Sequence, residues 1–187
     1  MACELTKGRG LDCKDVIGGI RSVFFAQLDD TTITSSAGSV SDLDITTNVY
    51  KYNLVRATGS FTETVTASAE NGTVFYEPSV NIKLHKLSVA DRNEIKLLAQ
   101  NRLIMFVETN GINANGKRVV FCLGAENGME LSTGTASSGV AFADMNGYDL
   151  TFVGMESEPA LVVADYTDNA LDNSNFNADA GLTITES

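Results

Sequence analysis

The residues that could carry acid–base or thiol chemistry are few: one histidine, His85, and three cysteines, Cys3, Cys13 and Cys122. His85 stands near Lys83 on the polar phase of an alternating strand pattern, so we expect it to face solvent from a sheet. Catalysis by a cysteine–histidine pair would require a thiol to meet this imidazole, and no motif near the cysteines marks a nucleophile. The residue counts alone do not exclude a Ser/His/Asp triad, but the chain has no G-x-S-x-G motif, which would place a serine nucleophile on a sharp turn. We therefore predict no enzymatic activity and no catalytic residue.

The three cysteines also argue against cross-links and thiolate metal sites. Their number is odd and no C-x-x-C pair occurs, which is not the pattern of a disulfide framework or a zinc site. Cys122 lies within the apolar run of residues 119–123. A buried structural thiol is the expected interpretation there.

Paired carboxylates occur at three places and could in principle bind calcium or hydrolyse glycosides. The two aspartate pairs lack the D-x-D-x-D-G spacing and the closing glutamate of a calcium loop. The glutamate pair lies in a loop, and the sequence does not give the distance between the two carboxylates on which glycosidase chemistry depends. We interpret all three as solvated acidic loops and predict no metal ligand. The pairs are Asp29 with Asp30, Asp42 with Asp44, and Glu156 with Glu158.

The N-terminal glycines do not form a nucleotide-binding motif. Residues 8–10 and 18–19 match neither a P-loop nor a dinucleotide fingerprint, because no helix start and no G-K-[ST] follows them. We therefore predict no cofactor. The same segment holds the basic cluster of the chain, which we interpret as an arm that pairs with an acidic neighbour and not as a nucleic-acid site. Its members are Lys7, Arg9, Lys14 and Arg21.

Composition indicates a folded, strongly acidic protein. The 187 residues fit one domain, and 43% hydrophobic with 20% charged residues is ordinary for a globular chain. The formal net charge of −11 repels DNA and anionic membranes, since sequence-independent phosphate binding needs Lys and Arg. The charge has two interpretations: it keeps the protein soluble, or it keeps a passing polyanion from sticking to the surface.

The sequence predicts synthesis in the cytoplasm and no membrane partner. The first ten residues lack the apolar stretch of a signal peptide. No segment approaches the roughly 20 apolar residues that cross a bilayer.

Short alternating segments separated by turn signals predict many β-strands. The clearest is residues 80–84, where Val80, Ile82 and Leu84 alternate with polar residues. The Asn-Gly pair at residues 71–72 is a strong hairpin signal, because both residues tolerate positive φ. Other strands are predicted over residues 20–28, 43–55, 58–68, 103–109, 117–123, 148–153 and 161–164, with polar loops over residues 29–42 and 133–139.

One segment predicts a helix, from Ser88 to Asn101. Ser88 is a good N-cap, and Asp91 suits the positive end of the helix dipole. Ile95, Leu98 and Ala99 recur at helical spacing and should face the protein body.

These elements predict a mainly β fold, a β-sandwich or barrel with one flanking α-helix (about Ser88–Asn101) and extended N- and C-terminal arms. No composition break and no fixed-period repeat divides the chain. We expect a single domain over residues 1–187, with an N-terminal arm at 1–19, a β core at 20–164 and an acidic C-terminal arm at 165–187.

A basic arm, an acidic arm and long polar loops around a β core suit a subunit that contacts other copies of itself. Strand edges and arms can pair between chains. Closed rings form when a head-to-tail interface completes a rotation. We therefore expect a homo-oligomer.

The element order resembles a known family. Strands, one amphipathic helix, the segment of residues 103–123 and a closing strand with the sequence YDLTF at residues 148–152 look like the tail tube proteins of long-tailed bacteriophages, which are similar to the tube subunit of type VI secretion systems. The segments CKDVIGGI and LAQNRLIMFVE…LGAENGMELSTGTASSG…DMNGYDLTF also look like virion proteins of phages of Bacteroidetes-type hosts. The resemblance covers residues 11 to 164 in element order.

The resemblance implies a β-barrel with one helix that forms hexameric rings, which stack into a hollow tail tube that conducts DNA without binding it specifically. Other tail proteins would be partners, and the virion tail the location after assembly in the host cytoplasm. Long arms and an acidic tail are not required by that family. They leave open a capsid decoration or head–tail connector protein, or a β-sandwich module that binds a receptor or a carbohydrate. The absence of Trp and the 7% aromatic content disfavour sugar binding.

Overall fold

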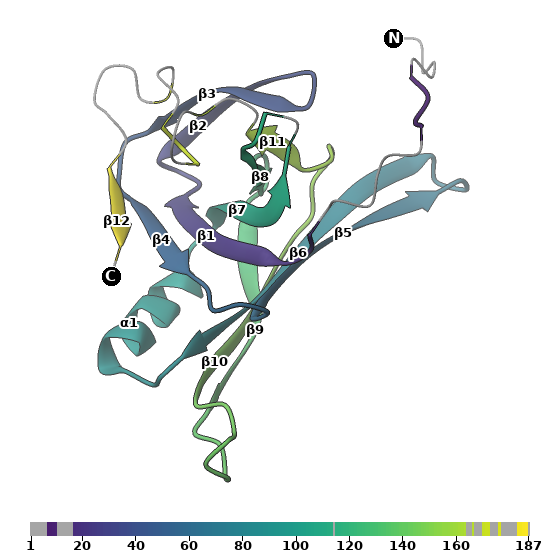
Figure 1. Ribbon diagram of the computed structural model, residues 1–187. Helices are drawn as coiled ribbons and strands as arrows, with labels where there is room; N and C mark the ends of the chain where they lie inside the picture. The colour runs from purple at the N-terminus through teal and green to yellow at the C-terminus, as the bar shows by residue number, and fades with distance from the viewer. Residues whose placement is uncertain are drawn as a thin grey trace.

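The computed structural model describes residues 7–10, 17–113, 115–163, 166, 170–172, 176 and 183–186 (Figure 1). Within these residues the protein is mainly β with one helix, as predicted. The strands form a large mixed sheet that does not close into a barrel, so of the two predicted architectures the sandwich is the one observed. The elements are β1 (Ile20–Gln27), β2 (Thr31–Ser36), β3 (Ser39–Ile45), β4 (Val49–Asn53), β5 (Gly59–Ser68), β6 (Thr73–His85), α1 (Val89–Leu98), β7 (Leu103–Ile112), β8 (Arg118–Leu123), β9 (Met129–Ser137), β10 (Gly147–Gly154), β11 (Leu161–Val163) and β12 (Ile184–Glu186).

The strands divide into a curled part and a flatter part. Strands β12, β4, β1, β7, β8, β11, β3 and β2 pair in that order and curl around one core. Strands β9, β10, β6 and β5 form the flatter part, and a short pairing of Leu103 with Met129 joins it to β7. We call this second part the outer sheet.

Strands β1 and β7 are buried on both faces because they lie between two cores. Phe24 and Phe106 point into the core inside the curl, whereas Phe25 and Met105 point into the core against the outer sheet. A strand buried on both sides needs a continuous apolar run, and β7 has one at residues 103–107. The chain thereby joins its two layers through one pair of strands.

The hairpins of the outer sheet extend beyond the body at opposite ends (Figure 1). The last residue of β10 that pairs with β6 is Val153, opposite Ser79, so the β5–β6 turn projects past the end of β10. At the other end Gly147 pairs with His85, the final residue of β6, so the β9–β10 turn projects past that point. The Asn-Gly pair predicted to form a turn at residues 71–72 lies at the first projection, where Gly72 has φ +63°.

The predicted helix is confirmed, but it is shorter at its C-terminal end. The Ser88 side chain accepts a hydrogen bond from the Asp91 N–H at 3.0 Å, as an N-cap does. The helix ends at Leu98, three residues before the predicted limit. Leu98 is buried and Ile95 half-buried, whereas Ala99 is exposed and does not face the body as expected.

Both predicted long polar loops are wrong. Residues 29–42 contain β2 and much of β3, which form a hairpin around Ala37 and Gly38, and residues 133–139 contain much of β9. Both segments are rich in Ser, Thr and Gly, which resembles loop composition. Strand pairing stabilises them nevertheless, since threonine fits a pleated surface. The predicted strand at 43–55 is split into β3 and β4.

The C-terminal arm does not simply extend from the body. Among its described residues, Tyr166, Leu171 and Phe176 are buried in the core inside the curl. Strand β12 pairs in parallel with β4. The apolar residues scattered between the aspartates of this segment explain why it packs. In the N-terminal arm, residues 1–6 and 11–16 lie outside the described residues, and residues 7–10 and 17–19 are exposed.

Truncation of a buried ring should measure how much the double-sided strands contribute. Phe106 is fully buried, so Phe106→Ala should lower the free energy of unfolding by about 3–5 kcal/mol through lost burial and a residual cavity. Phe142→Ala, the same change at a fully exposed ring, should alter it by less than about 0.5 kcal/mol. Urea unfolding of dilute protein followed by circular dichroism provides both values, and equal losses would contradict the core assignment.

Candidate interaction surface

The structure keeps the histidine and the described cysteine apart. His85 is exposed at the end of β6, in the position expected from the strand pattern. Cys122 is buried in the core inside the curl, as expected, and burial together with the nearby Glu156 raises the pKa of its thiol. A thiol held in its protonated form is a poor nucleophile. Cys3 and Cys13 lie outside the described residues.

The paired carboxylates do not gather into a metal site. Asp42 accepts a hydrogen bond from the adjacent Leu43 N–H at 2.9 Å, and Asp29 and Asp44 are exposed. No group of three or more His, Cys, Asp or Glu side chains among the described residues could hold a metal ion. These aspartates therefore stay part of the solvated surface of the β2–β3 region.

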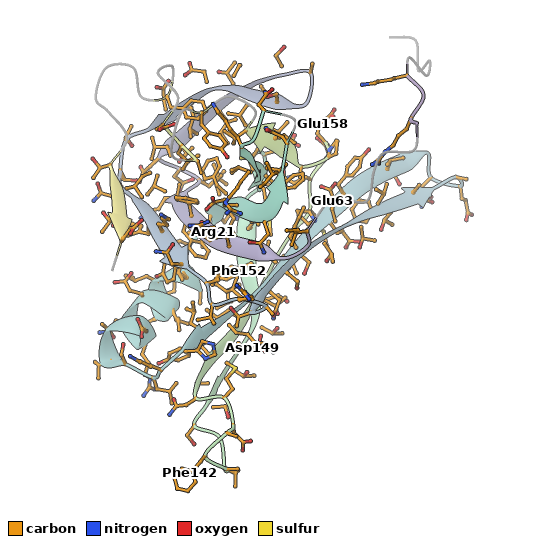
Figure 2. All side chains as sticks on the ribbon, viewed as in Figure 1. Arg21, Glu63, Phe142, Asp149, Phe152 and Glu158 are labelled. Carbon is orange, nitrogen blue, oxygen red and sulfur yellow. The ribbon has the colours of Figure 1, made fainter. Side chains whose placement is uncertain are left out.

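Glu156 and Glu158 instead border an open acidic cleft of about 590 Å³. The cleft lies between the β2–β3 turn, the outer sheet and the segment before β11, and its lining residues include Glu63 and Glu158, which are labelled in Figure 2. Glu126 also lines it, and its described lining contains no Lys or Arg. Three of these carboxylates hold backbone in place. Glu63 accepts the Ala160 N–H at 2.7 Å, Glu126 accepts the Ser157 N–H at 3.3 Å, and Glu156 accepts two N–H groups.

Glu156 is a buried carboxylate, and the groups around it shift its pKa in opposite directions. Its two oxygens accept the N–H groups of Glu126 and Asn127, both at 3.0 Å, which fixes the turn before β9. Burial raises the pKa of this carboxyl, and the charge of Glu126 acts in the same direction, whereas the backbone N–H groups lower it. The net pKa is raised. Sequence reasoning placed Glu156 in a loop, but it could not detect the turn that this side chain fixes.

The raised pKa of Glu156 predicts a pH dependence of stability. Because the folded state binds this proton more tightly than the unfolded state, the group stabilises the fold at low pH. That contribution is lost as pH rises through the raised pKa. The unfolding free energy of the wild type, measured relative to Glu156→Gln, should therefore fall as pH increases from about 4, near the ordinary pKa of a glutamate, through the raised pKa of the folded state. Urea unfolding at several pH values across that range tests this prediction, with the exposed Glu158→Gln as control. A difference in unfolding free energy between wild type and Glu156→Gln that does not change with pH would contradict the prediction.

The outer sheet has two edges without a strand partner among the described residues. Strand β5 pairs only with β6 along residues 59–68. Strand β9 pairs with β10, and beyond Met129 its other side pairs with no described strand. Unpaired edges present rows of N–H and C=O groups that can accept another strand. These two edges lie on opposite sides of the same four strands.

One face of the outer sheet packs on the body and the other is polar. Val80, Ile82 and Leu150 point inward. On the opposite face one row crosses the sheet from edge to edge, with neighbours placed side by side by the strand register: Ser60, Asn81, Thr151 and Thr133. We call this polar side the hydroxyl face.

Charges on the hydroxyl face are largely compensated. Asn81 donates to Asp149 at 2.6 Å and to Thr151 at 3.0 Å, and the Lys83 ammonium lies 3.5 Å from the other Asp149 oxygen. Glu77 accepts a hydrogen bond from the Thr66 hydroxyl. That neutral hydroxyl leaves the negative charge of Glu77 in place. The face is thus a weakly acidic, hydrogen-bonding surface that offers no concentration of cations to phosphate.

The described helix is ten residues long, too short to cross a bilayer. Comparison of the chain with protein-family models, curated proteins and solved structures gave no match.

Sequence reasoning missed one of the two edges, because it interpreted residues 133–139 as a loop. A usable signal was present in Thr133 and Thr135, because threonine is common in strands. A register shift between Leu131 and Thr133 puts these two residues on opposite faces, so simple alternation does not extend through this segment. The other edge, β5, lies within the predicted strand at 58–68.

Proposed function

We propose that this protein is a structural virion subunit that assembles with copies of itself into rings, and that stacked rings form a phage tail tube that conducts DNA. The observation that carries the proposal is the pair of free edges on the outer sheet. If β9 of one copy pairs with β5 of the next, the sheet continues from copy to copy. Main-chain hydrogen bonds then supply the contact, as in other cases of strand addition.

Such a contact is heterologous, because it joins one edge to a different edge. A heterologous contact repeats indefinitely and closes into a ring if its rotation divides a full turn. Sheets twist in one direction, which gives each added copy a rotation of constant hand. The sequence resemblance supports six copies.

The hydroxyl face is the candidate lining of the channel. In a closed ring, one face of the continuous sheet points inward. The hydroxyl face presents hydroxyl and amide groups with paired charges, and the whole chain carries a net charge of −11. A lining with few free cations would not hold phosphates, so DNA could slide past it. No catalysis and no cofactor belong to this proposal.

Negative-stain electron microscopy of the purified chain tests the proposal directly. Rings or tubes with a central hole are the expected result. A protein that stays monomeric at high concentration would contradict it and favour a binding module, while attachment to capsid surfaces would favour a decoration protein.

Proline substitution tests whether the β9 edge forms the ring contact. In an edge strand, consecutive N–H groups alternate between the partner strand and the free side, so one of Thr135→Pro and Ala136→Pro removes only a free-side donor. That variant should keep the unfolding midpoint of the monomer and lose rings. Thr135→Ala, which keeps the N–H group, should retain them. Rings that persist in a stably folded proline variant would contradict this use of the edge.

A further inference from the structure

The two projections of the outer sheet carry apolar side chains that no described part of the chain covers. At the β9–β10 turn, Val140 and Phe142 are fully exposed, and Phe142 lies at the far tip of the molecule (Figure 2). We call these two residues the hairpin tip. At the β5–β6 projection, Val65 and Val74 are 57% and 54% exposed. With Tyr76 they lie on the face that continues the core, and we call the three the apolar strip.

The hairpin tip is held in shape although its side chains are exposed. The Asp144 carboxylate accepts the N–H groups of Val140 and Ala141 at 2.9 and 2.8 Å, and the Asp144 N–H donates to the Ala141 carbonyl. These backbone donors also lower the pKa of Asp144. A loop ordered before contact loses less conformational entropy when it binds. The tip therefore has the properties of an anchor.

The apolar strip belongs to the side of the β5–β6 hairpin that packs on the body farther along. On the same face, Phe61 lies 5.1 Å from Phe121, ring centre to ring centre. Beyond Phe61 the body still contacts the hairpin through Glu63, which accepts the Ala160 N–H, and through the backbone pairing of Tyr76 with Glu156. Past these contacts the apolar side chains of Val65 and Val74 are exposed. A hairpin end that contacts only water does not require exposed apolar side chains. A hairpin end that packs on a second protein surface does require them.

Charge indicates that the occupant is another copy of this chain. Two copies with a net charge of −11 each repel one another except where charges are sparse. Residues 137–148 contain one charged side chain, Asp144, and residues 65–76 contain one, Glu70. The two projections are thus surfaces at which two acidic copies can meet with little repulsion.

Position fixes how the copies would meet. Hydrogen bonds between strands run perpendicular to the strands, so edge pairing adds copies sideways. The projections instead extend along the strands, in opposite directions. We propose that the hairpin tip of one copy packs on the apolar strip of another, a head-to-tail contact along the strand direction that stacks one ring on the next. The inference rests on the proposed function, because only an edge-paired ring makes this direction axial.

The size of the contact agrees with this role. A buried aromatic ring removes about 150–250 Å² of surface from water. Two such rings, Phe142 and the half-buried Tyr76, with three valines fall below the roughly 1,200 Å² of a stable stand-alone dimer. A contact of this size holds only when it is repeated around a ring, where each copy contributes one and the contacts act together. An isolated monomer should therefore not dimerise through it.

Substitution at either projection should separate ring formation from stacking. Phe142→Ser, and separately Val65→Thr with Val74→Thr, should leave rings and shorten or abolish tubes in negative stain. Val55→Thr is the matched control, because Val55 is 56% exposed outside both projections. Tubes of wild-type length in both projection variants would overturn the inference while leaving the ring proposal intact.

Cysteine pairing tests the contact without depending on tubes. In a background with Cys3→Ser and Cys13→Ser, Phe142→Cys and Val74→Cys chains should form a disulfide-linked dimer under mild oxidation only when mixed. Either chain alone should stay monomeric on non-reducing gels. Dimers of one variant alone, or none in a mixture that forms rings, would overturn the inference. Dimers in the mixture without any rings would support the tip-to-strip contact and contradict the proposed function.

Discussion

Strands β1 and β7 have to be buried on both faces, and the rest of the architecture follows from that constraint. Their alternate side chains supply two cores, one inside the curled strands and one against the outer sheet. The shared strands are the reason the two layers form one structure. Close approach is part of this arrangement: at Gly59, where β5 begins, a Cβ atom would lie 2.7 Å from the Leu54 side chain and 3.3 Å from Ile20. A side chain there would force the Leu54 side chain to move and would press on Ile20 of β1.

Burial of one face of the outer sheet leaves its other face and its edges to be used elsewhere. The inward side takes most of the aliphatic and aromatic residues, so the outward side is mainly hydroxyls with one amide, a paired Lys83 and Asp149, and Glu77. Val153 is an exposed apolar residue on that outward side. Its strands extend beyond the area that the body covers, so part of the apolar face stays exposed at the projections. Proteins usually protect long free edges, since they pair with other chains. The exposed edges are the feature that the proposed ring contact would use.

The acidic character of the chain has two separate roles in this view. Locally, carboxylates replace missing backbone partners: Glu63, Glu126 and Glu156 accept N–H groups in the loops around the cleft. This explains a cluster of glutamates without a metal or a substrate. Globally, the net charge keeps copies apart except where charges are sparse. Contact between copies would then be confined to the strand edges and the two projections.

The sequence by itself determined the β class, the helix cap at Ser88, the turn at residues 71–72, the exposed His85 and the buried Cys122. Each of these depends on local chemistry: alternation, capping, positive φ or an apolar run. Two hairpin segments were predicted as loops because Ser, Thr and Gly are common in loops. Only pairing with neighbouring strands makes these segments β. The C-terminal segment was expected to be an arm because its aspartates outweighed its spaced apolar residues.

Only the tertiary structure decided which edges stay free, which face of the outer sheet is mainly polar and where Phe142 is exposed. These properties depend on strand order and register, which bring together residues far apart in the chain. Ser60 and Thr133 share one row because β6 and β10 lie between them. Alternation gives each strand two faces, but it does not say which neighbour covers either one.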